Sequence, residues 1–220
     1  MNLDLCFRSG DRNEFIITSI TSALKSLLNL RALKLGFINQ IITVDDGIQQ
    51  LFKILKNLKL LTFLCLSFGK ENIITDHELE SLSQSLNELT LLKNLDLSFT
   101  NTNSLTNKGI ETLAHAIQRL HNLQNLRLSF EYFHQVDERG VKMVGEALQN
   151  LPFLSLFSFR SCGSLPGKKK ASSFASLLAV LTKIQNPMEI ILKIPYDEVK
   201  CQEAEKLLKV KYLVVRFFEP

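Results

Sequence analysis

The chain has 220 residues, of which 45% are hydrophobic, and it carries a formal net charge of +4. This length allows one or two ordinary domains. Charges of both signs are spread along the sequence, which argues against the concentrated basic surface of a nucleic-acid-binding protein. No segment approaches the ~20 consecutive apolar residues that cross a bilayer, so we expect no membrane span.

The cysteines argue for a reducing environment. Four of them lie far apart, at Cys6, Cys65, Cys162 and Cys201, and form neither a CxxC pair nor a cluster with histidine. Isolated cysteines are typical of proteins that are kept reduced. Charged residues near the N-terminus stand where a secretory signal needs an apolar run. We therefore expect a cytoplasmic or other reducing intracellular location.

The first predicted strand is Leu3–Phe7, in which hydrophobic residues alternate with others. Apolar residues at helical spacing follow over about residues 15–28. The alternating pattern then returns at Leu33–Phe37 as a second short strand. This order of strand, loop, helix and loop is repeated along the chain.

Near-copies of the second strand recur at a constant interval. They stand at Leu64–Phe68, Leu95–Phe99 and Leu126–Phe130, and each begins 31 residues after the one before. A fixed period of this size is the sequence signature of a repeat array, or solenoid. Each repeat of such an array buries its apolar face against its neighbours.

The helices between these strands are predicted to begin at equivalent positions. These starts lie near Asp45, Asp76, Asn107 and Glu138. Thr75 and Glu78 have the spacing of a capping box, in which two side chains satisfy two backbone amides. Local helix signals and the long-range period therefore agree.

The repeats become less regular beyond about residue 162. The period predicts a strand at Phe157–Ser161, and further strands are predicted at Ile190–Ile194 and Leu213–Phe217. Helices are expected over about residues 174–181 and 199–209. Terminal repeats of solenoids are commonly atypical, so we predict a single domain over residues 1–220 with about seven or eight repeats.

The leucine spacing in each unit resembles the leucine-rich repeat, as in Leu120–Leu128 with its LxxLxxLxL order. Because a full helix fits into every unit, the chain is similar to the ribonuclease-inhibitor-like subclass. The resemblance implies an α/β horseshoe with a concave parallel sheet and convex helices. It also implies protein binding as the usual function.

Two features depart from that family. The unit is longer than the usual repeat of about 20–29 residues. The family's asparagine or cysteine after the strand, which satisfies turn backbone, is also replaced. Its positions hold Ile38, Gly69, Thr100 and Glu131. We interpret a set of inward-facing phenylalanines as a substitute buried ladder. They are Phe37, Phe68, Phe99 and Phe130.

The candidate binding surface is the concave face, because strand side chains alternate in direction and the leucines point inward. The outward-facing positions form three rows: Ala32, Phe63, Asn94, Asn125 and Leu156; Lys34, Cys65, Asp96, Arg127 and Ser158; and Gly36, Ser67, Ser98, Ser129 and Arg160. The candidate contact residues among them are Phe63, Cys65, Ser67, Asn94, Asp96, Ser98, Asn125, Arg127, Ser129, Ser158 and Arg160. Small third-row residues would let a partner's backbone approach closely. Lys193 and Arg216 extend that row and favour an acidic partner. The alternative is contact through the helices or the ends of the array.

The loop Gly163–Lys170 lies between a predicted strand and helix, which is the context of a phosphate-binding loop. It is one residue short of the GxxxxGK[ST] motif, and Lys169 replaces the hydroxyl that binds magnesium. Nucleotide hydrolysis is therefore not predicted. Lys168, Lys169 and Lys170 are candidates for holding an anion or an acidic partner, and the alternative is a solvated loop.

No catalytic or metal-binding constellation is predicted. The four histidines are His77, His115, His121 and His134, and none has metal-ligand spacing with Cys, Asp or Glu. We expect His115 on the apolar side of its helix and the other three exposed. We expect no enzymatic activity and no cofactor.

These patterns favour a non-catalytic protein–protein interaction module, either an adaptor or a structural subunit of a larger complex. Strands are predicted at both ends of the sheet, and open sheet edges invite pairing with another subunit or with further repeats. The alternative function is regulation of a partner enzyme, as inhibitor or activator, because a repeat surface can cover an active site.

Overall fold

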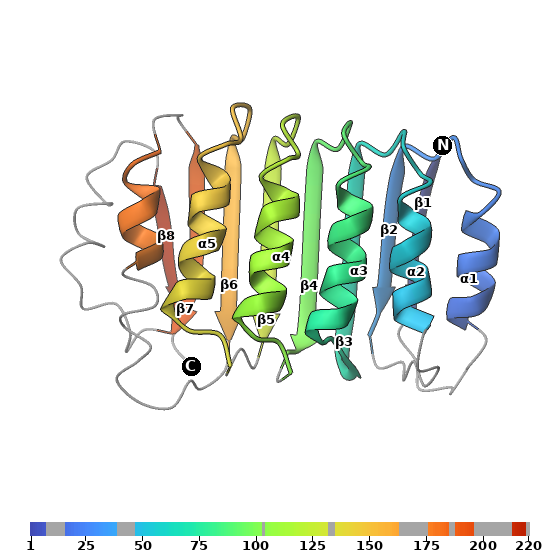
Figure 1. Cartoon of the computed structure of the whole chain (residues 1–220), viewed down its shortest axis with the longest axis horizontal. Helices are drawn as coiled ribbons and strands as arrows, with labels where there is room; N and C mark the ends of the chain where they lie inside the picture. Colours follow the sequence, from blue (N-terminus) through green and yellow to red (C-terminus); the bar gives the residue numbers. More distant parts are fainter. Residues whose placement is uncertain are drawn as a thin grey trace.

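In a computed structural model, the chain forms one parallel sheet with helices packed along one of its faces (Figure 1). The structure describes residues 1–7, 16–38, 47–102, 104–131, 135–162, 176–184, 188–195 and 213–218. Eight strands run in sequence order, and each pairs in parallel with the next. The predicted α/β class and the parallel sheet are confirmed.

Strands and helices alternate from β1 to β7. The strands are β1 (Asn2–Phe7), β2 (Ala32–Phe37), β3 (Phe63–Ile73), β4 (Asn94–Asn101), β5 (Asn125–Glu131), β6 (Leu156–Cys162), β7 (Glu189–Pro195) and β8 (Leu213–Phe218). The helices are α1 (Ile16–Leu24), α2 (Gly47–Leu55), α3 (Asp76–Leu86), α4 (Asn107–Ile117) and α5 (Glu138–Leu148). Residues 176–181 are also helical. The helix expected over about residues 199–209 lies outside the described residues.

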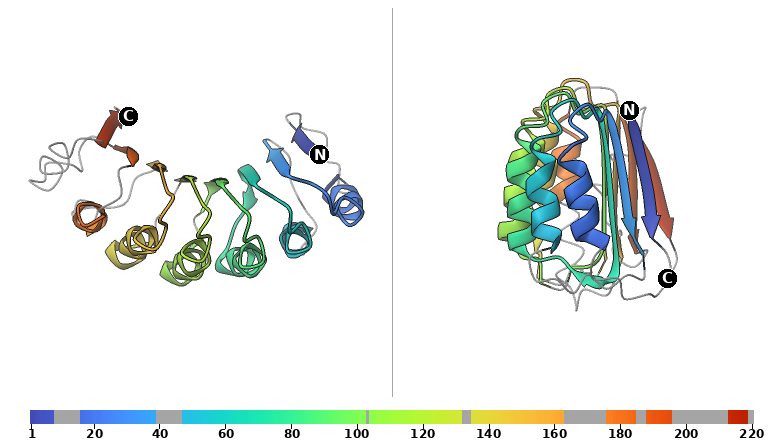
Figure 2. Two further views of the ribbon diagram at one scale, coloured as in Figure 1. Left: turned by 90° about the horizontal axis from the view of Figure 1, so that it is seen from above. Right: turned by 90° about the vertical axis from the view of Figure 1, so that its right-hand side faces the viewer.

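The array is curved, with the strands on the inside of the arc and the helices on the outside (Figure 2). The two layers need different spacings, because paired strands lie about 4.8 Å apart whereas packed helices lie about 8–10 Å apart. Stacking one strand and one helix per unit therefore bends the array toward its strands. The sheet face away from the helices becomes the concave face.

The inward side of the sheet is the core. In register, Leu33, Leu64, Leu95 and Leu126 align across four strands. Each is at most 1% exposed. The next strand places Phe157 at the same position, as the period predicts. Every repeat therefore completes the apolar layer of its neighbours.

The predicted phenylalanine ladder is confirmed and is longer than expected. Ring centroids of Phe7, Phe37, Phe68, Phe99 and Phe130 follow one another at 5.2 to 5.9 Å. In β6 the ladder position is Ser161, and Phe130 instead contacts Phe159 at 6.2 Å. Such aromatic pairs contribute about 0.5–1.5 kcal/mol beyond the burial of their area.

The helix starts follow the sequence signals. Helices α3, α4 and α5 begin at Asp76, Asn107 and Glu138, as predicted. The capping box of Thr75 and Glu78 is present. Each cap satisfies backbone amides that no helical carbonyl can reach.

Polar bonds also join successive helix starts. Thr106 donates to the Asp76 carboxylate through its backbone amide at 2.9 Å and its hydroxyl at 2.6 Å. One repeat later, the side-chain amide of Asn107 donates to Asp137 at 2.8 Å and accepts from the Asp137 backbone at 3.1 Å. The first residue of each of these helices therefore holds the N-cap residue of the next helix.

Two glycines make room for these bonds between successive helix starts, which we call the helix ladder. A Cβ added to Gly109 would lie 2.3 Å from Oδ1 of Asp76, and one added to Gly140 would lie 2.6 Å from Oδ1 of Asn107. Real Cβ atoms do not approach so closely, so any larger residue must displace the bridging side chain. The hydrogen bonds between helix starts therefore depend on glycine at these two positions.

Other side chains form hydrogen bonds with backbone carbonyl groups at the ends of the strands, where the sequence lacks the asparagine or cysteine that is typical of leucine-rich repeats. Buried Asn72 donates to the carbonyl of Phe37 at 3.3 Å. Buried Thr102 bonds the carbonyl of Glu131 through its hydroxyl and through its backbone amide, at 3.2 Å for the amide. These two residues connect neighbouring repeats near the carboxyl ends of the strands.

Candidate functional site

The sheet face away from the helices is built from residues that alternate with the buried ones. Its first row is Asn2, Ala32, Phe63, Asn94, Asn125, Leu156 and Glu189. Its second row is Asp4, Lys34, Cys65, Asp96, Arg127, Ser158 and Ile191. Its third row is Cys6, Gly36, Ser67, Ser98, Ser129, Arg160 and Lys193, which Arg216 continues. The register therefore brings all the predicted concave-face residues together.

Strand β1 also contributes to this face, although the three predicted rows did not include it. Asn2, Asp4 and Cys6 open the three rows. The sequence contains a signal for these three positions, because Leu3–Phe7 has the same alternation of hydrophobic and other residues as the later strands. The face thus begins one strand earlier than expected.

In the first row, the side-chain amide of Asn125 donates to the amide oxygen of Asn94 at 2.6 Å. This bond orients both side chains along the row. Among the described residues, the amide nitrogen of Asn94 and the amide oxygen of Asn125 have no hydrogen-bonding partner, so both are available to a ligand. Each side chain is half-buried, so both groups can be reached from solvent.

The second row begins with an ion pair. Nζ of Lys34 lies 3.1 Å from Oδ2 of Asp4, and both side chains are largely exposed. The hydrogen bond to Asp4 and its negative charge raise the pKa of Lys34. Pairs this exposed contribute little to stability, so this contact mainly fixes the direction of Lys34.

Asp96 occupies the centre of the second row. Burial raises the pKa of its carboxyl group, while the positive charges of Arg127 and Lys34 act in the opposite direction. Among the described residues, no hydrogen bond or ion pair holds this carboxylate. A half-buried acid without a close partner is therefore available to a ligand.

Cys65 neighbours Asp96 across the sheet. Burial, together with the negative charge of Asp96, raises the pKa of the thiol to about 11. Only the thiolate is a good nucleophile, so Cys65 is unsuited to nucleophilic chemistry near neutral pH. This position provides a small half-buried side chain rather than a reactive group.

The third row is lined by Ser67, Ser98 and Ser129, which pair in register and are half-buried. Within the part of the chain that the structure describes, their hydroxyl groups have no hydrogen-bonding partner. Three donors and acceptors in a line thus face solvent along the centre of the sheet.

The remaining candidates differ in outcome. Lys168, Lys169, Lys170 and His134 lie outside the described residues. His77 and His121 are exposed as expected, but the expectation for His115 was wrong, because it is exposed as well. The core side of α4 is formed instead by Ile110, Leu113, Ala114 and Ile117.

Metal-binding clusters and membrane-spanning helices are both missing from the described ranges. These ranges contain no group of three or more His, Cys, Asp or Glu residues that could hold a metal ion. They also contain no helix of the length and hydrophobicity required to cross a membrane.

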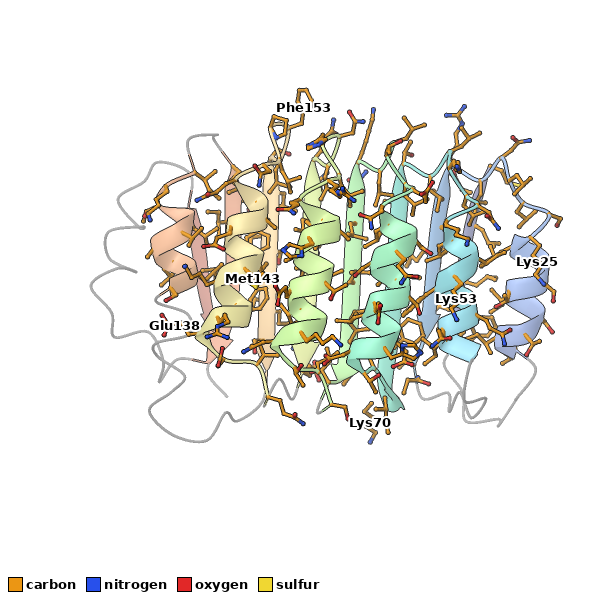
Figure 3. The ribbon with its side chains drawn as sticks, viewed as in Figure 1. Lys25, Lys53, Lys70, Glu138, Met143 and Phe153 are labelled. Atoms are coloured by element: carbon orange, nitrogen blue, oxygen red, sulfur yellow. The ribbon has the colours of Figure 1, made fainter. Side chains whose placement is uncertain are left out.

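Exposed apolar residues lie mainly away from this face. Leu60, Leu91 and Phe153 stand in the turns before β3, β4 and β6. Figure 3 shows Phe153 at the upper edge of the molecule, above the helices and strands. The centre of the sheet face is therefore the more polar surface.

No protein-family model matches the chain, and no curated protein is significantly similar to it. Its function is therefore inferred from the geometry of this surface.

Proposed function

We propose that the chain is a leucine-rich-repeat protein of the ribonuclease-inhibitor-like subclass, a horseshoe that serves as a non-catalytic protein–protein interaction module. The proposal is supported by the 31-residue spacing of aligned strands, the leucines at inward positions and the one helix in each central unit. In this view it acts as an adaptor or as a structural subunit of a larger complex, in a reducing intracellular compartment.

The observation that carries the function is the row of Ser67, Ser98 and Ser129. Their hydroxyls are half-buried and bond to nothing in the described part of the chain. A polar group that is partly desolvated without a partner gains from a hydrogen bond in a complex. Their small side chains also let the backbone of a partner approach the sheet.

The neighbouring rows add specificity. Asp96 offers a carboxylate, and the Asn94–Asn125 pair offers one amide nitrogen and one amide oxygen that their mutual bond does not use. Strands lie about 4.8 Å apart, so the rows over β3–β6 span about 15 Å, enough for a protruding loop or an extended segment of a partner. Donors and acceptors at fixed spacing select a partner by geometry more than by buried area.

The test is cross-linking mass spectrometry on the tagged chain purified from its source cells. The face variant is Ser98→Arg with Ser129→Arg, and the matched control is Ser19→Arg with Ser22→Arg on the exposed side of α1. We expect Lys34 and Lys193 to cross-link to one partner, and the face variant alone to lose these cross-links while its circular dichroism stays unchanged.

The opposite pattern would contradict the proposal. Lys25 and Lys53 lie on the helical layer (Figure 3). Cross-links confined to these lysines and unchanged in the face variant would place the partner on the helices instead.

A further inference from the structure

Five turns connect a helix to the next strand at one edge of the array. They occupy residues 25–31, 56–62, 87–93, 118–124 and 149–155, and they lie along the upper edge of the molecule in Figure 1. Backbone hydrogen bonds of 2.8 Å join neighbouring turns: Thr62 donates to Arg31, Lys93 to Thr62, Gln124 to Lys93, and Ser155 to Gln124. The turns are therefore held side by side in a fixed row, which we call the turn edge.

Exposed apolar side chains recur at the tips of these turns. The tips are residues 28–29, 59–60, 90–91, 121–122 and 152–153, and all of these residues are exposed. Four of them are large and apolar: Leu28 is 53% exposed, Leu60 37%, Leu91 44% and Phe153 62%. The residue after each tip is a buried leucine, which already anchors the turn in the core. Packing within the chain therefore does not account for the apolar tips.

The turn edge is also basic. Its turns contain Lys25, Arg31, Lys56, Lys59, Lys93 and Arg119, and their one acidic residue is Glu88. All seven residues are exposed. Glu88 lies 3.3 Å from Lys59, so the turns offer no acidic partner to the other five cations. Cations at helix carboxyl ends complement the helix dipole, which explains Lys25 and Lys56 but not Arg31 and Lys93 at the strand starts.

The opposite edge differs in charge. The starts of α3, α4 and α5, over residues 75–78, 106–109 and 137–140, hold acidic Asp76, Glu78, Asp137 and Glu138 and basic Lys108 and Arg139. These segments therefore carry a net negative charge, whereas the turn edge carries a net positive one. Such an asymmetry orients a protein in the field of an anionic surface, with its basic edge toward the surface.

We propose that the turn edge docks on an anionic membrane surface. Its cations lie at the lipid headgroups, and the tips Leu28, Leu60, Leu91 and Phe153 enter the boundary between headgroups and acyl chains. The array curves in the plane perpendicular to its strands (Figure 2), so all five turns face the same way and can meet one flat surface. This site lies outside the sheet face, so the proposed protein-binding surface stays open when the edge is docked.

A lipid surface fits the turn edge better than an acidic polypeptide does. The apolar side chains project from separate turns, and exposed polar tip residues such as Asn29 and Asn122 stand among them. Lipids adapt to separate side chains, whereas the core of a protein interface requires complementary packing and is depleted of lysine. A second copy of the chain is also disfavoured, because two basic edges would repel each other.

The first test is flotation of the full chain with vesicles of phosphatidylcholine alone or of equal parts phosphatidylcholine and phosphatidylserine. The charge variant is Lys93→Glu with Arg119→Glu, and its control is Lys53→Glu with Lys108→Glu at exposed positions of α2 and α4. The apolar variant is Leu91→Ser with Phe153→Ser. Its control is Ile38→Ser with Ile73→Ser, at exposed positions at the carboxyl ends of β2 and β3.

We expect the unaltered chain to bind the phosphatidylserine vesicles, to bind phosphatidylcholine alone far less, and to be released as salt rises. The charge variant should bind about tenfold more weakly or less, since each basic residue adds to the attraction of an anionic surface. The apolar variant should also lose about tenfold, because two inserted side chains are removed. Each control should change binding less than about twofold.

A second test reports insertion directly and does not depend on the charge reversals. The chain contains no tryptophan, so one introduced tryptophan is the only source of its fluorescence. Phe153→Trp is a mild change at an exposed tip, and Ile73→Trp is the matched control. We expect phosphatidylserine vesicles to shift the emission of the Phe153→Trp variant to shorter wavelength, as the side chain enters an apolar environment, and to leave the Ile73→Trp variant unchanged.

Three results would overturn the inference. They are the absence of binding to phosphatidylserine vesicles, equal losses in the edge variants and their controls, and an unchanged emission of the Phe153→Trp variant in the presence of vesicles. Poly-glutamate is the competitor that represents an acidic polypeptide. If it releases the chain from vesicles and binds more tightly than they do, the turn edge is a protein-binding surface and the membrane assignment fails.

Discussion

The carboxylate of Asp76 accepts two hydrogen bonds from Thr106, one from its backbone amide at 2.9 Å and one from its hydroxyl at 2.6 Å. The two residues are 30 positions apart, so the bonds join one helix start to the next. Asn107 and Asp137 repeat the arrangement. The ladder fixes the relative position of successive helices on the convex side, as the phenylalanine ladder fixes the strands.

Replacing Asp76 with alanine should therefore destabilise the array. Both bonds to Thr106 involve a charged acceptor, and such bonds contribute about 1.5–3 kcal/mol each when counted singly. We expect Asp76→Ala to lower the free energy of unfolding in urea by about 2 kcal/mol. Glu111→Ala, at an exposed position of α4, is the control and should change it by less than about 0.5 kcal/mol. Equal effects would show that the bridge is not stabilising.

Gly109→Ala should be destabilising although it lies in a helix. Alanine favours a helix over glycine by about 1 kcal/mol, so an unobstructed site would gain stability. At Gly109 the new Cβ would meet Oδ1 of Asp76 at 2.3 Å and displace it. In an Asp76→Ala background the same substitution should cost clearly less, because the contact with Oδ1 is gone and the contact with the Cα atom of residue 76 at 3.1 Å remains. Thermal unfolding of the four proteins of this cycle measures this coupling, and additive effects would contradict the proposed steric link.

Phe99→Ala should cost about 3–5 kcal/mol of unfolding free energy, the usual range for a buried phenylalanine. Its side chain is fully buried, and its ring lies 5.9 Å from both Phe68 and Phe130. Phe63→Ala, on the half-exposed sheet face, should cost clearly less. Urea unfolding of both variants measures the difference. A similar cost at the two positions would contradict the expected contribution of the buried Phe99 ring.

Much of the architecture follows from the sequence, because one period sets both the elements and their register. When equivalent strand positions recur every 31 residues, parallel pairing aligns Leu33 with Leu64 and Ser98 with Ser129. The three rows of the sheet face could therefore be predicted from the period and the alternation of strand side chains. The same period breaks down near residue 162, where the predictions become less specific.

The bonds between repeats could not be predicted from that pattern. Asn72 and Thr102 satisfy carbonyls of neighbouring strands, but the two residues differ in type and are not one period apart. Gly109 and Gly140 are one period apart, so a signal for the helix ladder existed. The reason for glycine at these two positions depends on the direction of the Asp76 and Asn107 side chains. The spacing of residues in the sequence does not show that direction.

The stability of the protein should depend on pH through Asp96. Burial raises the pKa of its carboxyl group in the folded state above the ordinary value of 3.8. The folded protein then binds more protons than the unfolded chain between these two pKa values, so stability falls as pH rises through this window. Above the folded pKa, the ionised carboxylate is a constant cost that the unfolded chain does not bear.

Asp96→Asn removes this cost while it keeps the size of the side chain. We expect the variant to be more stable than the unaltered protein at about pH 7, and the difference to disappear as pH falls below the ordinary aspartate range. Urea unfolding at a series of pH values measures it, with Asp4→Asn as a control on the same face. A variant that is less stable at about pH 7 would show that Asp96 is held by its charge attraction to Arg127. The expected gain would instead mean that the carboxylate of Asp96 destabilises the fold at the centre of the sheet face. Such a residue has no structural role, which favours a role in binding.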